Sequence, residues 1–350
     1  MSLAMCEQHK QKTRRITLST VASKAGVSLS TASLVLSGKA RQRRISEDVH
    51  ERVEQAARDL DYIPNMLVHS MQSGSTGVIS FFNGYRSRSV NDLYMDQLST
   101  AIERAAGVKG YDILVHCDFN RTIEQIYRSL NGGRSDGLLF FAPSSNDELL
   151  DMLRHSRLPT VLLGSKDQTG TLSSVTDSMK QGLTLIANKL IERRHSRVLM
   201  LGQSSAHNDD SINRIQALSS ILREAGIASE PQDTFFVNEL DLPDFVVKLQ
   251  SMLTEPNPPT AIFCWHDLLG YRLLDLCDQY GIDVPNQIAI AGYDGLHWPS
   301  RSSHLLTSAH FDLDVMASSS IEILIKTIRH EITSPSQLEI PSTLLQGTTL

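Results

Sequence analysis

TLSTVASKAGVSLSTASLVLSG, residues 17–38, decides the fold of the amino-terminal part of the chain. Its first half places apolar residues at the spacing of one helical face, at Leu18, Val21, Ala22 and Ala25. Gly26 interrupts this pattern, and glycine accepts the left-handed backbone that ends a helix. Ser28 can cap a second helix over 29–36. The stretch therefore predicts a helix-turn-helix, although two short helices joined at a glycine could also form a purely structural hairpin.

The charge around this stretch favours a nucleic-acid partner over a structural hairpin. Between Lys10 and Arg44 the chain carries nine Lys or Arg residues and no Asp or Glu, whereas a merely solvated face would mix the two signs. Residues 1–75 have a formal charge of +4 and the remainder −10, which together give the total of −6. A basic segment on an acidic body confines phosphate binding to the amino-terminal end.

The run from Thr17 to Asn65 resembles the DNA-binding domain of the LacI/GalR (lactose-repressor/galactose-repressor) family of transcription regulators. After the helix-turn-helix comes a basic loop, and RRISEDVHERVEQAARDLDYIPN then supplies a third helix and a Tyr-x-Pro-Asn exit. The inward stripe of this helix is Val49, Val53, Ala56, Ala57 and Leu60. Thr20 stands where an acidic residue is common and Leu34 where an arginine is frequent, so we expect an operator sequence unlike the usual one.

The resemblance implies that the second helix enters the major groove of operator DNA. Leu29, Ser30, Ser33 and Leu34 would then face base edges, and leucines there favour apolar contacts such as those with thymine methyl groups. The other predicted DNA contacts, which include the phosphate-holding basic loop, are Thr17, Ser28, Thr31, Lys39, Arg41, Arg43, Asn65 and Met71.

Residues 64–75 are predicted to form a hinge. Pro64 forces the preceding residue out of helix, Asn65 can cap a new turn, and 66–72 could form about two turns, too few to be stable alone. In the family resembled, this segment folds when two copies meet on DNA and an apolar side chain wedges into the minor groove. Met71 stands where that family usually has leucine and can serve as the wedge; the alternative is an ordinary linker with a solvent-facing methionine.

From Gly77 onward, short apolar runs alternate with amphipathic stretches, which is typical of parallel sheets covered by helices on both faces. The predicted strands are 78–82, 111–117, 137–142, 160–164, 197–201, 234–237, 261–264 and 288–293. The predicted helices are 93–106, 179–192, 212–224, 245–253, 268–280 and 315–330. About 270 residues of this pattern exceed one open sheet, so we expect two doubly wound α/β lobes.

Several sequence segments in this region resemble segments of the periplasmic-binding-protein-like core of the same family: RVLMLG, PPTAIFCWHDLLG, GIDVPNQIAIAGYDG, HLLTSAHFDL and the closing LEIPSTLLQGTTL. The predicted organisation is a flexible arm over 1–16, an all-α helix-turn-helix domain over 17–63, the hinge, and a core over 76–350. We expect one lobe to take 76–175 and 306–335, and the other 176–305 and 336–350. Because no heptad tail follows, a homodimer is the expected assembly.

Other classes of function lack their motifs. Neither GxGxxG nor GxxxxGK[ST] occurs, and the GxSxG match at 133–137 leads into a predicted strand, so it is no strand-to-helix nucleophile elbow. The twelve histidines form no HxxxH or HExxH pair. We therefore expect no enzyme, no cofactor and no metal. The four cysteines, Cys6, Cys117, Cys264 and Cys277, lie far apart and predict no disulfide framework. Without an apolar run long enough for a membrane span or a signal-peptide core, the expected location is the cytoplasm.

Two-lobed α/β proteins bind small molecules between the lobes, where strands end at their carboxyl edges. This rule selects residues 83–94, 203–214, 238–239, 265–267 and 293–294. By resemblance, Arg214 matches the family's effector-contacting arginine, and Asp294 matches the acidic residue of the Gly-Tyr-Asp block. The rest of the predicted effector set is Tyr94, His266 in place of a usual asparagine, Asn83 and Glu239.

Structural roles for the same residues remain open. Asp267 and Asp294 could cap the helices that follow them, and Arg214 could pair with Asp210 one turn earlier. If instead an arginine, acids and a tyrosine converge on the cleft, they suit a sugar, a sugar phosphate or a similar polar metabolite.

We therefore predict a ligand-responsive transcriptional repressor that binds a pseudo-palindromic operator in double-stranded DNA as a homodimer. A solute receptor with the same two-lobed core, without DNA regulation, is the alternative; it would need export. An enzyme on the α/β core is a third possibility, which turnover assays would separate from both.

Overall fold

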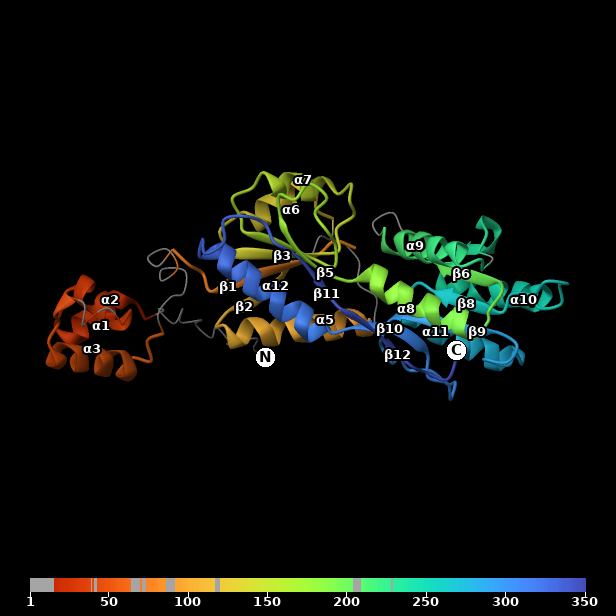
Figure 1. The fold of residues 1–350 in the computed structure, drawn as a ribbon. Coiled ribbons are helices and arrows are strands. Elements are labelled where there is room, and N and C mark those ends of the chain that lie inside the picture. The colour runs from red at the N-terminus through yellow and green to blue at the C-terminus, as the bar shows by residue number, and fades with distance from the viewer. Residues whose placement is uncertain are drawn as a thin grey trace, which may run out of the picture. The chain divides into compact units, whose positions relative to one another are not determined.

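The computed structural model describes residues 16–38, 40, 43–63, 70, 74–85, 92–116, 120–203, 209–227 and 229–350. The chain divides into two compact units, Met1–Thr76 and Gly77–Leu350, and each is described by itself (Figure 1). Among the described residues, no helix has the length and apolar character that crossing a membrane requires.

The first unit is a bundle of three helices, α1 (Leu18–Ala25), α2 (Leu29–Leu36) and α3 (Glu47–Asp59). Its core is small and built mainly of alanine and valine, which lets short helices approach closely: Val21, Ala22, Ala25, Ala32, Val35, Ala40, Val53, Ala56 and Ala57. The predicted inward stripe of α3 is confirmed, with Val49 and Leu60 packed at the margin. Arg52 also donates from Nη1 to the carbonyl oxygen of Ala25 at 3.2 Å, which satisfies the carboxyl end of α1.

The second unit contains two six-stranded sheets, and the first defines the N-lobe. Its strands are β1 (Val78–Asn83), β2 (Asp112–His116), β3 (Gly137–Phe141), β4 (Thr160–Leu163), β5 (Ser173–Asp177) and β11 (Gln337–Ile340). They are parallel, in the order β11-β5-β4-β3-β1-β2. The helices of this lobe are α5 (Leu93–Val108), α6 (Ile123–Leu130), α7 (Glu148–Arg154) and α12 (Leu313–Ile328).

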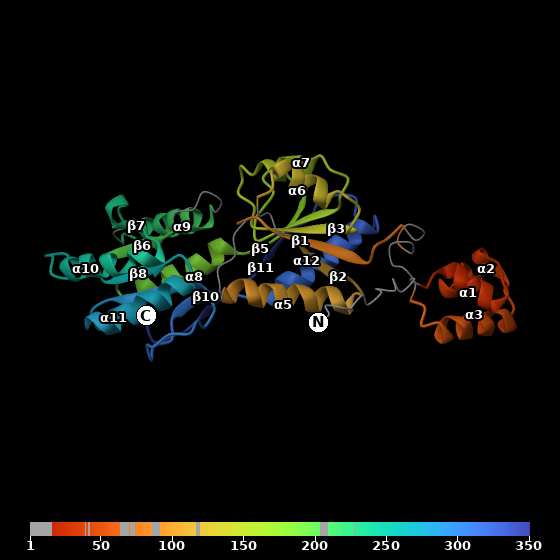
Figure 2. The same cartoon turned by 180° about the vertical axis from the view of Figure 1, so that it is seen from behind.

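Alternation along the strands explains why both faces of the N-lobe sheet are covered. Phe82, Leu138 and Phe140 belong to one buried cluster with residues of α6 and α7. Phe81 and Leu139 belong to the other cluster, with residues of α5 and α12. Successive side chains of a strand point to opposite faces, so continuous apolar runs require helices on both sides, as Figures 1 and 2 show.

The second sheet defines the C-lobe. Its strands are β6 (Val198–Gly202), β7 (Thr234–Phe236), β8 (Ala261–Cys264), β9 (Ala289–Asp294), β10 (Thr307–Phe311) and β12 (Ser342–Leu345). Their order is β12-β10-β9-β8-β6-β7, and only the pair β10 and β12 is antiparallel. The helices are α8 (Met179–Glu192), α9 (Asp210–Glu224), α10 (Leu242–Met252) and α11 (Asp267–Tyr280). The predicted fold class, a helical amino-terminal domain followed by two parallel α/β lobes, is confirmed.

The chain passes between the lobes three times: after β5, after β10 and after β11. Two of these crossings fall a few residues later than the sequence predicted. Residues 307–311 belong to the C-lobe sheet as β10, and 337–340 belong to the N-lobe sheet as β11. Ser, Thr, Gln and Glu make up much of these strands and of β5, so no apolar run marks where they begin or end.

Candidate functional site

The turn between α1 and α2 is held by local hydrogen bonds. Gly26 adopts a left-handed backbone with φ of 66°, and Val27 N donates to the carbonyl oxygen of Ala22 at 3.0 Å. Ser28 Oγ accepts from Thr31 N at 3.1 Å and so caps α2. A non-glycine residue at position 26 would be strained, so this turn fixes the angle at which α2 leaves α1.

The face of α2 that carries the predicted base contacts lies outside the core of its own unit. Leu29 is 54% exposed, although leucine is among the residues that are usually buried. Thr17, Ser28, Ser30 and Arg43 are also exposed, and Thr31, Ser33 and Leu34 are half-buried. The opposite face of α2 supplies Ala32 and Val35 to the core. Lys39, Arg41, Asn65, Met71 and the predicted hinge helix over 66–72 lie outside the described residues.

In the second unit, Arg214 stands at the centre of a polar cluster at the carboxyl ends of the strands. It is 8% exposed, and its Nη1 donates to Asp294 Oδ1 at 3.0 Å and to the carbonyl oxygen of Trp265 at 2.9 Å. Its guanidinium also lies over the ring of Tyr293, 4.0 Å from the centroid. Arg214 therefore pairs with Asp294 across the lobe, and Asp210 on the same helix is a further negative charge near it.

Residues of the N-lobe complete the cluster. Tyr85 donates its hydroxyl to Asp210 Oδ2 at 2.9 Å, and Tyr293 donates to Asp177 at the end of β5. Tyr94 packs near Phe141 and Phe311, with ring centroids 6.0 and 6.5 Å apart. Burial, together with the nearby carboxylates of Asp294 and Asp177, raises the pKa of Tyr94 above its usual value. Aromatic rings and carboxylates from both lobes thus surround one guanidinium.

The carboxylates of the cluster outnumber the guanidinium of Arg214 that they surround. Burial raises the pKa of Asp294 to about 7, which the neighbouring Arg214 only partly offsets. Burial likewise raises the pKa of Asp210. Burial alone would lower the pKa of Arg214, but Asp294 and the surrounding acids raise it above its usual value. One guanidinium offsets only part of the desolvation of Asp294 and Asp210, so Arg214 stays charged while the pKa values of these two carboxyls lie above their usual range.

His266 has a defined tautomer. Its Nδ1 accepts a hydrogen bond from Leu269 N at 3.0 Å and caps α11. Burial lowers the pKa of His266 to about 4, so the ring is neutral at physiological pH and its proton must reside on Nε2. The ring stacks beside Trp265, with centroids 4.1 Å apart. His266 therefore offers one N–H donor to a ligand in addition to its structural role.

The predicted effector residues differ in what they do. Tyr94, Arg214, His266 and Asp294 come together, whereas Asn83 Oδ1 accepts from Tyr85 N at 3.0 Å and orients that tyrosine. Glu239 begins a short 3-10 helix after β7, and its side chain is not among those that the structure describes. Asp267 is fully buried and accepts from Leu296 N and Ser308 Oγ, both at 2.6 Å, so it shapes the loop after β9.

Sequence reasoning missed Asp177, Phe141 and Phe311 as members of the cluster. Each is the last residue of a strand, β5, β3 and β10 respectively. The rule that ligands bind at carboxyl ends would have selected them, but it needs the strand ends. Among the described residues, no group of histidine, cysteine and acidic side chains is arranged to hold a metal ion.

A second acidic residue at the start of α9 joins the two lobes. Asp209 Oδ2 accepts from Ser144 Oγ at 3.1 Å, Ser145 N at 3.1 Å and Ser145 Oγ at 3.0 Å. Burial alone would raise the pKa of Asp209, but these donors hold it below its usual value. The contacts are therefore strongest above the ordinary carboxyl pKa and are lost as the pH falls through the depressed one.

Replacing Asp209 with alanine is expected to shift the lobes toward an open arrangement. Hydrogen bonds to a charged group contribute about 1.5–3 kcal/mol when buried. Asp209 is only half-buried, so we expect roughly a tenfold shift in the open-to-closed ratio. Single-molecule energy transfer between dyes on the two lobes measures this ratio. Asp278→Ala, which removes an exposed carboxylate from α11, should leave it unchanged; equal shifts in both variants would contradict the assignment.

Relatives of known function cover nearly the whole chain. The HTH-type transcriptional repressor PurR of Vibrio atlanticus is 26% identical over 319 residues, 89% of this chain and 92% of that protein. PurR of Photobacterium profundum is 27% identical over 318 residues, with the same coverage of both chains. The lac repressor dimer bound to operator and the anti-inducer ONPF has the same fold, with a TM-score of 0.79 at 22% identity, over 96% of this chain and 99% of that one. The CelR–cellobiose complex gives 0.64 at 22% identity, over 96% and 100%.

A helix-turn-helix unit and a two-lobed core with a polar cluster at its strand ends define a class, the ligand-sensing DNA-binding regulators. The family model for bacterial regulatory proteins of the lacI family matches residues 17–65, and the model for a periplasmic binding protein-like domain matches 187–350. The chain is thus a LacI-type regulator in both of its parts, a helix-turn-helix domain followed by a periplasmic-binding-protein-like effector domain. The curated relatives that it resembles along most of its length are transcriptional repressors and not enzymes. A solute receptor without DNA regulation would leave residues 17–65 unexplained.

Proposed function

We propose that the chain binds a pseudo-palindromic operator as a homodimer and changes its operator affinity when a neutral, sugar-like molecule occupies the cluster around Arg214. The observation that carries the proposal is the buried guanidinium, held by Asp294 between aromatic rings of both lobes. The repressor–operator dimer and the cellobiose complex of the structural relatives support the same assembly and ligand class. Acting on operator DNA in this way places the protein in the cytoplasm.

The charge balance favours a neutral polyhydroxyl compound over a sugar phosphate. Asp177, Asp210 and Asp294 surround a guanidinium whose Nη1 is already bonded, so an added anion would face unscreened carboxylates in a desolvated site. Hydroxyl groups can instead donate to those carboxylates. Their oxygens can accept from His266 Nε2 and from the buried indole nitrogen of Trp265, for which no hydrogen-bond partner is found among the described residues.

Coupling to DNA is proposed to run through the segment 64–75. A ligand that prefers one arrangement of the lobes would change the spacing of the two hinge segments in the dimer, and typical coupling free energies are about 1–3 kcal/mol. Leu29, Ser30, Ser33 and Leu34 are proposed to read bases, with Ser28, Thr31 and the basic loop on phosphates. Fluorescence anisotropy with an operator selected from random duplexes, titrated with neutral sugars and their phosphates, tests the proposal. An operator affinity that no neutral sugar changes would contradict the ligand class.

Effector affinity is expected to fall as the pH is lowered through the pKa of Asp294. A hydroxyl donor binds the ionised carboxylate, and burial raises the pKa of Asp294 to about 7, so lowering the pH from 8 to 6 should weaken binding about tenfold. The same raised pKa affects stability. Between pH 3.8 and about 7 Asp294 ionises more readily in the unfolded chain than in the folded protein, so the free energy of unfolding falls as the pH rises through this range. Titration calorimetry across this range measures the affinity. Asp294→Asn should bind more weakly and without this pH dependence; an unchanged profile would exclude Asp294 as the titrating group.

A further inference from the structure

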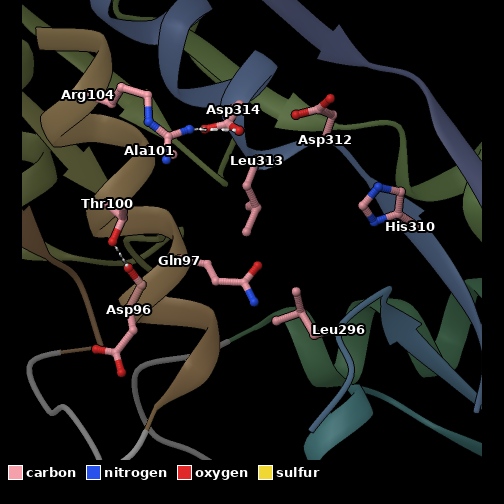
Figure 3. Close-up of a pocket in the computed structure, with 10 residues that line it drawn as sticks. All are labelled: Asp96, Gln97, Thr100, Ala101, Arg104, Leu296, His310, Asp312, Leu313 and Asp314. Carbon is pink, nitrogen blue, oxygen red and sulfur yellow. Dashed lines mark hydrogen bonds and ion pairs between the residues drawn. The ribbon is translucent and has the colours of Figure 1, made fainter.

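A separate cavity of about 440 Å³ lies between the lobes, beside the segment that leads from β10 into α12. Its walls come from α5 in the N-lobe, from Leu296 in the loop after β9, and from His310 and residues 312–314 (Figure 3). Ligand pockets in proteins typically measure about 300–1,000 Å³. The cavity is therefore large enough for a small organic molecule that touches both lobes.

The lining combines a few polar groups with apolar walls. Figure 3 shows Gln97, Leu313 and His310 extending from different elements into the same space. Asp312 lies beside His310, and its Oδ1 accepts from Val315 N at 3.0 Å to cap α12. The buried Nδ1 of His310 has no hydrogen-bond partner among the described residues. This nitrogen lies toward Gly295 in the loop after β9, so the polar groups that the cavity offers a ligand are those of Gln97 and Asp312.

The arginine in the cavity wall, Arg104, is already paired with a carboxylate. Arg104 Nη1 lies 3.0 Å from Asp314 Oδ1 and 3.2 Å from Oδ2, and this pair closes one end of the cavity. Asp312 is a further carboxylate of the lining, and the side-chain carbonyl of Gln97 can also accept a hydrogen bond. Ala101, Leu296 and Leu313 supply apolar surface. This lining offers hydrogen-bond acceptors on one side and apolar surface on the other.

The cavity is distinct from the cluster around Arg214, although the two share a wall. His310 is the register partner of Asp294 in the β9–β10 pair. The next residue, Phe311, packs toward Tyr293 and Tyr94, with centroids 6.3 and 6.5 Å away. Because successive residues of an extended segment point to opposite sides, Phe311 faces the cluster while His310 and Asp312 face the cavity.

We propose that this cavity is a second ligand site, which takes a small organic cation with an apolar body. An amine or amidine would donate to Asp312 and to Gln97, and its apolar part would pack on Leu296 and Leu313.

Benzamidine serves as the probe, because it joins a planar cation to a ring. Titration calorimetry with the full chain is expected to show saturable binding of benzamidine and none of benzoate, which has the same size and the opposite charge. Gln97→Trp adds bulk at an exposed position of α5 and should weaken benzamidine binding at least tenfold. Asp312→Asn keeps a residue that can cap α12 but removes the charge, and we expect a similar loss. Arg214→Ala should leave benzamidine binding unchanged.

Three results would overturn the second site: no saturable binding of benzamidine, equal binding of benzoate, or a loss of binding in Arg214→Ala that Gln97→Trp does not share. The last would place the cation in the cluster around Arg214. Thr100→Trp, at another exposed lining position on α5, repeats the steric block if Gln97→Trp has a lowered thermal transition. Binding that persists in both folded tryptophan variants would also overturn it.

Discussion

Replacing Arg214 with alanine is expected to abolish the effector response while leaving operator affinity nearly unchanged. The variant removes the ion-pair partner of Asp294 and the cation that lies over Tyr293. Truncating one partner of a buried, hydrogen-bonded charge pair in a binding site typically costs about 2–5 kcal/mol of binding free energy, which corresponds to a loss in effector affinity of about thirtyfold or more. Operator anisotropy with and without saturating neutral sugar measures both quantities in one experiment.

Arg223→Ala is the matched control, because Arg223 lies on the same helix and is exposed. It should leave both the effector response and operator affinity unchanged. A joint loss of operator binding and effector response in Arg214→Ala would mean that Arg214 holds the C-lobe together. Circular dichroism would then show a lowered thermal transition for that variant and not for Arg223→Ala.

The contrast between Arg214 and its neighbours shows which parts of the site the sequence could predict. Arg214 and Asp294 lie in stretches whose pattern and resemblance are strong, and the structure joins them. Asp177 and Phe311 close strands of polar or mixed composition, and their place in the cluster depends on how two sheets are ordered. Pattern rules describe local periodicity, whereas contacts between β5, β9 and β10 depend on the tertiary fold.

The same physical distinction applies to the fold. The turn at Gly26 and the inward stripe of α3 follow from local rules of capping and helical period, and both were predicted. Buried strands such as β3 and β8 are continuous apolar runs and were predicted as well. By contrast, β11 lies at an edge of the sheet, and three of its four residues are exposed. Its sequence therefore has no continuous apolar run from which a strand could be predicted.

Operator affinity is expected to fall steeply with salt. A protein that neutralises about 6–10 phosphates loses roughly 10³–10⁵ in affinity between 50 and 200 mM salt. Each chain carries nine basic residues from Lys10 to Arg44 and no acidic residue among them, so a dimer has more than enough positive charge to neutralise this many phosphates. Measuring the operator dissociation constant by anisotropy across this range gives the slope of log affinity against log salt. A flat dependence on mixed-sequence duplex would contradict DNA binding by this unit.

Two variants separate phosphate contacts from base contacts on the same surface. Arg43 and Leu29 are both exposed in the first unit, but only arginine can release a counterion. Arg43→Ala should therefore weaken binding to all duplexes alike and reduce the salt slope by about two for a dimer. Leu29→Ala should keep the slope and lower the preference for operator over random duplex, because it removes an apolar contact and no charge. The assignment of the two roles would be wrong if Leu29→Ala changed the slope, or if Arg43→Ala changed only the preference.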